Sequence, residues 1–168
     1  MTEEWRAVVG YEGAYEVSDQ GRVRSLPRDV PLRGGLTRRQ AGRIKKPTVR
    51  SGRHEVLLWK GGERKLVRTY RLVLEAFRGP CPPDHEACHW DDDPANNRLE
   101  NLRWGTASEN QRDRVRNGKH NNANKTECPQ GHGYTPENTY INSKGSRECR
   151  ECMRESNLRS KRNQRGKS

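Results

Sequence analysis

Four residues near the C-terminus have the types and spacing of a zinc site. Three residues separate Cys128 from His132, two separate Cys149 from Cys152, and sixteen lie between the two pairs. A tight turn or a helix start can bring each pair to one tetrahedral ion, and three cysteines with one histidine are a common structural zinc set. Because four protein ligands close the coordination sphere, we predict a zinc ion that supports structure and does not activate water. The alternative is four unrelated residues.

A second group of residues suited to chemistry lies between residues 85 and 110, where histidine, aspartate and asparagine recur. We expect a short strand to end near His89, a polar loop with Asp, Pro and Asn to follow, and a second strand to cover residues 101–104. A Thr-x-x-Glu capping box begins at Thr106, which predicts a helix start and places Asn110 in the first turns. Both strands and the helix start should therefore meet at one small site.

This block resembles the HNH motif of the ββα-metal nucleases in its phage and homing-endonuclease form. The positions that carry the resemblance are His89, Asn97, Asn101, Leu102, Trp104 and Asn110. Residues 4–26 resemble the nuclease-associated modular DNA-binding motif that commonly precedes this core, and residues 70–77 resemble the helix between the two. The resemblance spans roughly residues 4–117. The C-terminal cysteines and histidine also resemble a small zinc module found in some phage and actinobacterial HNH proteins.

The resemblance implies a metal-dependent endonuclease that hydrolyses phosphodiester bonds of double-stranded DNA, in a homing or nicking role. His89 would be the general base that takes a proton from the attacking water. Asn101 would hold the other side of the ring and fix its tautomer. Asn110 would offer a side-chain oxygen to Mg²⁺ or Mn²⁺. The simpler alternative is a solvated loop and a capped helix in which His89 is merely hydrogen-bonded.

One position departs from the pattern. The residue before the general base is usually a metal-binding carboxylate or histidine, and here it is Cys88. Because a thiolate is a soft ligand poorly matched to Mg²⁺, we expect Cys88 to be buried and inert in preference to a ligand. The ion is then held by Asn110, phosphate and water, or another group substitutes. Asp91, Asp92 and His85 are candidate substitutes, although Asp92 in this loop is also typical of a turn. A DNA-binding protein with a decayed nuclease site is therefore one rival hypothesis.

Charge and composition favour a nucleic-acid partner. The 168 residues carry 34 Lys and Arg against 22 Asp and Glu, a net charge of +12, and only 29% are hydrophobic. A polyanion is the natural partner of such a chain, and small modules are more plausible than one large core. We expect phosphate contacts from six arginines: Arg22, Arg24, Arg28, Arg98, Arg103 and Arg112. The alternative for the first three is an ordinary solvated sheet face.

Several elements should position these residues. Short antiparallel strands are expected within residues 4–26, and a long basic loop over residues 27–50 that orders on DNA. A hairpin with a Gly-Gly turn should follow within residues 54–70. A helix should then bury a stripe of apolar side chains and end at Gly79-Pro80. That stripe comprises Leu72, Val73, Ala76 and Phe77.

We therefore predict an α+β protein with a small N-terminal antiparallel sheet, a ββα-metal HNH core and a zinc-bound C-terminal module. The expected parts are residues 1–50 (sheet and basic loop), 51–118 (hairpin, helix and nuclease core), 119–126 (linker), 127–153 (zinc module) and 154–168 (basic tail). The tail has six basic residues against one glutamate, which is typical of a solvated or phosphate-contacting segment.

The remaining expectations concern the setting of the protein. No apolar run is long enough to span a bilayer and the N-terminus lacks a signal peptide, so we expect an intracellular protein, in the host cytoplasm if a phage encodes it. Five cysteines in a reducing compartment favour metal binding over disulfides, and Cys81 has no evident partner. A monomer is favoured. A further rival is a nuclease accessory to viral DNA packaging, which genomic position would distinguish.

Overall fold

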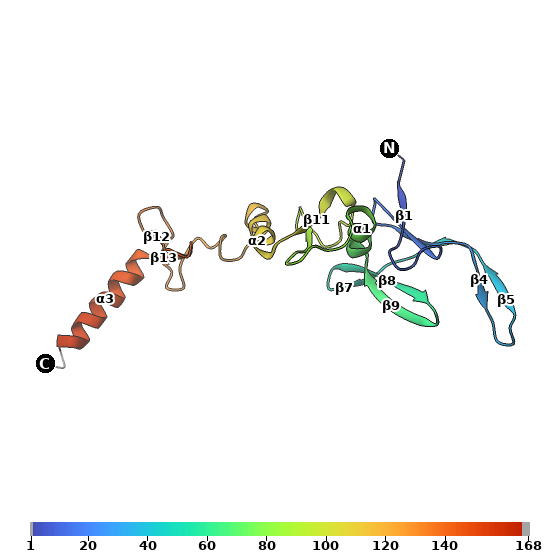
Figure 1. The fold of residues 1–168 in the computed structure, drawn as a ribbon. Coiled ribbons are helices and arrows are strands. Elements are labelled where there is room, and N and C mark those ends of the chain that lie inside the picture. Colours follow the sequence, from blue (N-terminus) through green and yellow to red (C-terminus); the bar gives the residue numbers. More distant parts are fainter. Residues whose placement is uncertain (1, 166–168) are drawn as a thin grey trace. The chain divides into compact units, whose positions relative to one another are not determined.

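A computed structural model describes residues 2–165, and these form two compact units, one up to Asn117 and one from Gly118 (Figure 1). The N-terminal motif and the predicted nuclease core lie together in the first unit, so the division expected at residue 50 does not appear as a boundary between compact units. The three last residues of the basic tail, 166–168, lie outside the described residues. Among residues 2–165, no helix has both the length and the apolar character needed to cross a membrane.

The first unit begins with a four-stranded sheet in the order β1-β2-β3-β6. Its strands are β1 (Trp5–Ala7), β2 (Tyr15–Ser18), β3 (Val23–Ser25) and β6 (Arg43–Ile44). Tyr15, Val17, Val23 and Ser25 are buried, whereas Glu16 and Arg24 are only partly buried, which is the alternation of a sheet with one face on a core. The short antiparallel strands expected in this region are confirmed.

The expectation of an irregular loop over residues 27–50 is wrong. This segment forms a hairpin of β4 (Arg28–Pro31) and β5 (Thr37–Gln40), then β6 and β7 (Thr48–Arg50). The residues of β5 are polar and mostly exposed, and backbone pairing forms the ladder, so hydrophobic periodicity gave no signal for this strand.

The Gly-Gly hairpin is confirmed. β8 (Arg53–Lys60) pairs with β9 (Glu63–Arg68), and Gly61 and Gly62 have positive φ angles of 59° and 85°. Such φ angles suit glycine and allow the tight turn that the strand twist requires. The strand β7 completes a three-stranded sheet in the order β7-β8-β9.

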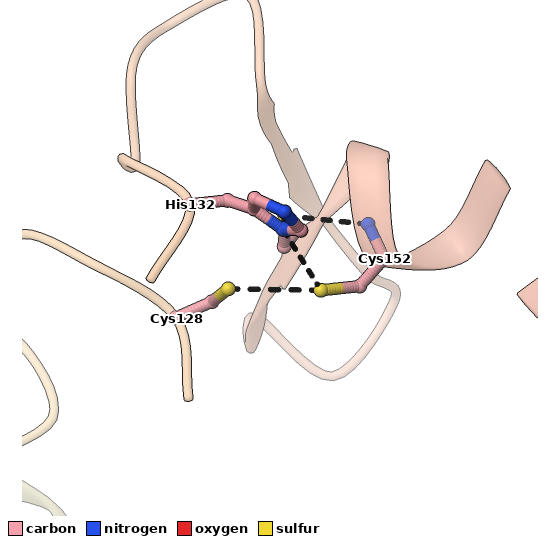
Figure 2. A group of neighbouring side chains, drawn as sticks. Cys128, His132 and Cys152 are labelled. Carbon is pink, nitrogen blue, oxygen red and sulfur yellow. Dashed lines mark hydrogen bonds between the residues drawn. The ribbon is translucent and has the colours of Figure 1, made fainter. Parts of the chain in front are cut away.

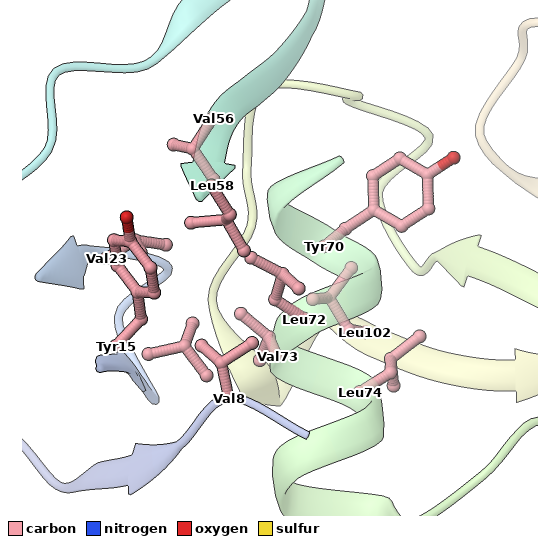
Figure 3. Close-up of a cluster of buried hydrophobic side chains, with 11 residues drawn as sticks. Val8, Tyr15, Val23, Val56, Leu58, Tyr70, Leu72, Val73, Leu74 and Leu102 are labelled. Carbon is pink, nitrogen blue, oxygen red and sulfur yellow. The ribbon is translucent and has the colours of Figure 1, made fainter. Parts of the chain in front are cut away.

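The central helix α1 (Thr69–Arg78) joins the sheets into one core and ends at Gly79, as predicted. Figure 3 shows Leu72, Val73 and Leu74 of this helix beside side chains from β2, β3, β8 and β11. Val73, Leu74 and Leu58 are completely buried, whereas Ala76 and Phe77 pack at the edge. Removal of this apolar surface from water is the main stabilisation of the first unit.

The predicted nuclease core forms a hairpin and a helix. β10 (Glu86–His89) pairs antiparallel with β11 (Leu102–Gly105), the 3₁₀ turn η1 (Leu99–Asn101) precedes β11, and α2 (Ala107–Arg116) follows it. Thr106 caps α2: its hydroxyl accepts from the Glu109 amide while the Glu109 carboxylate accepts from the Thr106 amide. The predicted ββα order and the capping box are confirmed.

The N-terminal sheet packs directly on the loop of this core. The amide of Leu99 donates to the carbonyl of Asp19 at 2.8 Å. At Gly21, with a φ of +77°, a Cβ atom would lie 2.7 Å from the carbonyl oxygen of Asn97. Only a glycine fits this turn, so the sheet and the polar loop are held against each other.

The second unit contains a small hairpin and a helix. Its strands are β12 (Thr139–Ile141) and β13 (Arg147–Cys149), and its helix is α3 (Arg150–Arg165). The basic tail, expected to be a solvated or phosphate-contacting segment, is helical as far as Arg165. In the described part of this unit, Cys128 and Cys149 are the buried residues of apolar type, so a hydrophobic core cannot be its main stabilisation.

Candidate active site and metal centre

His89 lies at the end of β10, opposite Leu102, with its side chain half-buried. Its ring packs edge-to-face against Tyr70 of α1, with 5.2 Å between the ring centroids and an interplanar angle of 79°. Desolvation by this burial lowers the pKa of His89 below the usual range of histidine. The imidazole is therefore held mainly in its neutral form near pH 7, as a proton acceptor must be.

Asn97 sets the chemical roles of the two ring nitrogens. Its side-chain oxygen lies 3.3 Å from Nε2 of His89, and its side-chain nitrogen lies 3.3 Å from both the carbonyl oxygen of Ala95 and Nδ1 of His54. Because a carbonyl can only accept, the Ala95 contact orients the amide so that its oxygen faces His89. The neutral ring then carries its proton on Nε2 and its lone pair on Nδ1.

Asn101, predicted to hold the ring of His89, instead fixes the loop that carries Asn97. Its side-chain oxygen accepts from the Asp91 amide at 3.1 Å, and its nitrogen donates to Asp91 Oδ1 and to the Asn96 carbonyl, both at 2.9 Å. The hydrogen bonds of this buried amide thus run to the two ends of the polar loop. Asn101 contributes to the imidazole geometry indirectly, through Asn97.

Asn110 lies in the first turns of α2 and faces the hairpin, as the capping box predicted. Its side-chain nitrogen donates to Oε1 of Glu86 at 2.8 Å. Glu86 begins β10 and is exposed. A carboxylate and an amide in contact at the surface are oxygen donors of the kind that Mg²⁺ and Mn²⁺ prefer.

Cys88 is buried beneath this surface, at 1% exposure. Desolvation raises the pKa of its thiol to about 11, so the group stays protonated at neutral pH. Opposite it on β11, Arg103 donates to the buried Asp113 of α2 at 2.6 Å and forms a longer ion pair with Glu109 at 3.4 Å. The thiol therefore belongs to the packing between the hairpin and α2.

Asp91 serves the loop. Its Oδ1 accepts from the Asn101 side chain at 2.9 Å and from the Asp93 amide at 2.8 Å, while its Oδ2 accepts from the Asn96 side chain at 2.7 Å. These hydrogen bonds to the charged form lower its pKa against the opposing effect of burial, which is the largest single influence. The other two candidate metal ligands, Asp92 and His85, have contacts with residues other than Asn110. Asp92 faces Arg114 at 3.9 Å, and Nδ1 of His85 lies 2.7 Å from the Pro83 carbonyl.

The six arginines expected to contact DNA differ in their surroundings. Arg24 lies over the Trp5 ring at 4.2 Å and is paired with Glu16, and Arg22 is paired with Glu3. Arg28 lies over the Tyr15 ring at 4.9 Å. Arg22 is exposed, whereas Arg24 and Arg28 are partly buried, and Arg28 also donates to the Ala14 carbonyl and the Tyr15 hydroxyl, both at 3.1 Å.

The other three arginines belong to the predicted nuclease core. Arg98 is exposed beside Glu100, and Arg112 donates to the hydroxyl of Ser108 on the surface of α2. Arg103 is turned inward to the buried Asp113, so we leave it out of the interface proposed below.

Cys128, His132, Cys149 and Cys152 converge in the second unit, with their ligand atoms all within 4.8 Å of one another. Figure 2 shows the sulfur atoms of Cys128 and Cys152 beside the imidazole of His132. The Cys128–Cys152 sulfurs are 3.6 Å apart, and Nδ1 of His132 is 3.3 Å from Cys152 Sγ and 3.7 Å from Cys149 Sγ. For metal–sulfur bonds of about 2.3 Å, a tetrahedron has edges of about 3.8 Å, so the four groups fit one tetrahedral ion.

The thiols of this cluster are electrostatically unequal. The backbone amide of Cys152, which lies 3.5 Å from the sulfur of Cys149, is the main reason that the pKa of Cys149 falls to about 6. Desolvation, together with hydrogen bonds to the other two sulfurs, raises the pKa of Cys152 to about 12. The sulfur of Cys149 is thus the one most readily deprotonated to a thiolate, and a bound cation would stabilise the negative charge of the other sulfurs.

A capped helix against a two-stranded hairpin, with a histidine at the strand end, is the ββα arrangement expected of an HNH endonuclease core. Residues 67–112 match the HNH endonuclease family and residues 3–59 match the NUMOD4 motif. The chain therefore carries a NUMOD4 motif followed by an HNH endonuclease domain, as the sequence resemblance predicted.

One relative covers both parts. The chain is 32% identical over 115 residues to DNA endonuclease I-HmuI of Bacillus phage SP01, an alignment that spans 68% of this chain and 59% of the relative. A solved structure described as DNA binding and cleavage by the HNH homing endonuclease I-HmuI matches with a TM-score of 0.55 and 32% identity, over 70% of this chain and 61% of that one. The chain thus spans about three fifths of the length of this relative.

The roles of two residues near the site were not predicted from the sequence. Asn97 was noted as part of the motif but given no role, and its contact with His89 crosses a loop whose path no local pattern reveals. Glu86 had a usable signal, because it lies two residues before Cys88 and therefore on the same face of the strand.

Proposed function

We propose that this chain is a metal-dependent endonuclease that hydrolyses phosphodiester bonds of double-stranded DNA, with His89 as the general base. The observation that carries the proposal is the hydrogen bond from His89 Nε2 to the oriented amide of Asn97, which leaves Nδ1 as a proton acceptor. The HNH match over residues 67–112 and the similarity to a DNA endonuclease support it.

The chain's own groups account for the proton transfer. Nδ1 of His89 accepts a proton from a water molecule as the water oxygen attacks phosphorus. The Nε2–H bond to Asn97 is retained throughout and becomes stronger as the ring gains positive charge. The bond from phosphorus to the leaving oxygen breaks, and one strand is cut.

A hard divalent cation, Mg²⁺ or Mn²⁺, would supply charge stabilisation at the phosphate and the leaving oxygen. The resemblance to the HNH motif makes Asn110 the amide ligand, and its place in the first turns of α2 beside a carboxylate fits such an ion. The buried thiol of Cys88 and the loop-bound carboxylate of Asp91 fit it poorly.

The DNA interface that we propose runs along the N-terminal sheet to the nuclease loop. Arg22 lines a hollow of about 490 Å³ together with Lys45 and Lys46, and Asn97 forms part of the wall of the same hollow. Basic side chains beside the orienting amide would bring a phosphate backbone towards His89. Arg24, Arg28, Arg98 and Arg112 would extend the contact.

We further propose that the cysteine cluster holds a structural Zn²⁺ ion, since four protein ligands leave no position for water. The phage origin of the relative supports a phage-encoded enzyme that acts in the host cytoplasm. A homing or nicking role, and action as a monomer, also belong to this proposal.

A plasmid-cleavage assay tests the proposal. Supercoiled DNA would be incubated with the full chain and Mg²⁺ or Mn²⁺, with EDTA as the metal-free arm. We expect His89→Ala to reduce the cleavage rate by about 10²- to 10⁴-fold, the usual contribution of a general base. His120→Ala, the same change in the second unit, is the matched control and should cleave normally.

Cleavage that persists in His89→Ala would refute the assignment of the base. DNA binding by the wild-type chain without cleavage in any metal would favour the rival, a DNA-binding protein with a decayed site, for which the burial of Cys88 is the supporting observation.

A further inference from the structure

Cys88 and Asp91, two of the groups expected to bind the cation, are both committed to other contacts. The Cys88 side chain is buried against Gly105, where an added Cβ would lie 3.1 Å from its sulfur. The Asp91 carboxylate accepts three hydrogen bonds that hold the polar loop together. A cation bound to either group would have to displace packing or loop contacts, which favours a different oxygen as the second protein ligand.

The alternation of the strand identifies that oxygen. Glu86 and Cys88 lie two residues apart on β10 and share one face of the hairpin. Glu86 pairs with Gly105, the last residue of β11, and α2 begins two residues further along the chain. The exposed Glu86 carboxylate therefore reaches the start of α2, where Asn110 donates to it at 2.8 Å.

We propose that Glu86 and Asn110 together bind the divalent cation of the nuclease core, and that Glu86 takes the place of the ligand missing at Cys88. This inference rests on the proposed function for its choice of a hard cation such as Mg²⁺ or Mn²⁺. It assigns a role to a residue outside the motif positions.

The geometry suits two neighbouring ligands of one ion. Mg²⁺ demands near-octahedral oxygen ligands at about 2.1 Å, so adjacent ligands are about 3.0 Å apart. The carboxylate oxygen of Glu86 and the side-chain nitrogen of Asn110 are separated by 2.8 Å. Rotation of the Asn110 amide by half a turn exchanges its nitrogen for its oxygen and places two oxygens at the required separation.

The surrounding charges also suit a cation. Arg103, a cation under the hairpin, is neutralised by ion pairs with Asp113 and Glu109. The exposure of Glu86 leaves the other coordination positions open to water and a DNA phosphate, as is usual for Mg²⁺.

Binding of Mn²⁺ to the full chain, with its zinc in place, tests this pair. The loss of free Mn²⁺ signal in electron paramagnetic resonance gives the dissociation constant. Glu86→Gln keeps the shape of the side chain and removes its charge, and we expect it to weaken Mn²⁺ binding at least about tenfold, since even outer contacts of a metal site are worth that much. Asn110→Asp, which exchanges an amide for a carboxylate, should tighten binding.

Two controls make the result decisive. Cys88→Ser should leave the Mn²⁺ dissociation constant within about twofold of wild type, and so should Glu100→Gln, the same change at an exposed glutamate of η1. The inference is overturned if Glu86→Gln binds Mn²⁺ as wild type does, if Cys88→Ser weakens binding as much as Glu86→Gln, or if the wild-type chain binds no Mn²⁺.

The same variants separate this inference from the proposed function. Mn²⁺ binding that depends on Glu86, in a chain that does not cleave plasmid DNA, would leave the site standing and the function refuted. Cleavage by a chain whose Mn²⁺ binding ignores Glu86 would refute the site alone.

Discussion

Asn97 Oδ1 accepts a hydrogen bond from His89 Nε2 at 3.3 Å, and the opposite end of the same amide donates to the carbonyl of Ala95. This relationship makes a loop residue responsible for the tautomer of a strand residue. Because only one tautomer presents Nδ1 as an acceptor, the orientation of the amide decides which ring nitrogen can act as a base.

Asn97→Leu should therefore slow DNA cleavage by a folded protein. Leucine fills the volume but accepts no hydrogen bond, so the two neutral tautomers of His89 should coexist. We expect a rate loss of roughly 10- to 100-fold, as for other partners that orient a functional imidazole. Nitrogen-15 NMR of the imidazole would show the mixed tautomers directly.

Asn121→Leu, the same substitution in the second unit, is the control and should leave both the spectrum and the rate unchanged. A single Nε2-protonated tautomer in Asn97→Leu would contradict the role assigned to this amide.

The pH dependence of cleavage should reflect the buried imidazole. Burial lowers the pKa of His89, and the base must be neutral to accept a proton. Cleavage should therefore rise with pH through a midpoint below about 6.5, the ordinary value for histidine, and be fully developed above it. Single-turnover rates between pH 5 and 8 provide the measurement.

The hydrogen bond to Asn97 opposes the effect of burial, since it raises the pKa. In Asn97→Leu the midpoint should move further down. A midpoint above 6.5 in the wild-type protein would show that the group titrating is not this imidazole.

Gly21 joins the N-terminal sheet to the nuclease loop, and its substitution by alanine should destabilise the first unit. Two effects add: the positive φ of +77° disfavours a side chain, and the new Cβ would lie 2.7 Å from the Asn97 carbonyl. Gly10 allows the two effects to be measured separately, because its φ is +78° but a Cβ there meets no atom within 4 Å.

We expect Gly10→Ala to cost about 1 kcal/mol in the free energy of unfolding, and Gly21→Ala to cost clearly more. Denaturant titration of both variants gives the comparison. Equal losses would mean that the loop yields to the added methyl group, and that the two parts are coupled less tightly than their contact indicates.

Removal of the metal should unfold the second unit and leave the first folded. The hydrophobic cluster lies in the first unit, whereas the described part of the second buries little besides two cysteines. Metal analysis should find one zinc ion per chain, and Cys152→Ser should lose it. Amide NMR spectra before and after chelation would show which resonances collapse.

Cys81→Ser is the matched control for this experiment, because Cys81 lies in the first unit and its thiol donates to the His85 carbonyl. This variant should retain its zinc. A second unit that keeps its dispersed resonances without metal would show that the four ligands are not what stabilises it.

Many structural features of this protein can be predicted from short stretches of its sequence. The Gly-Gly hairpin, the buried stripe of α1, the capping box at Thr106 and the two ligand pairs of the cysteine cluster each depend on residues a few positions apart. Such signals survive without a structure because turn conformation, helical periodicity and metal geometry act over short stretches of chain.

The tertiary structure decided what lies between the elements. Residues 27–50 form paired strands where a loop was expected. The contact with His89 comes from Asn97 and not from Asn101, and Glu86 lies beside Asn110. Each of these depends on groups brought together by the packing of a hairpin, a helix and a sheet turn. Hydrogen bonds across such packing follow distance in space and not spacing in sequence, so no local pattern specifies them.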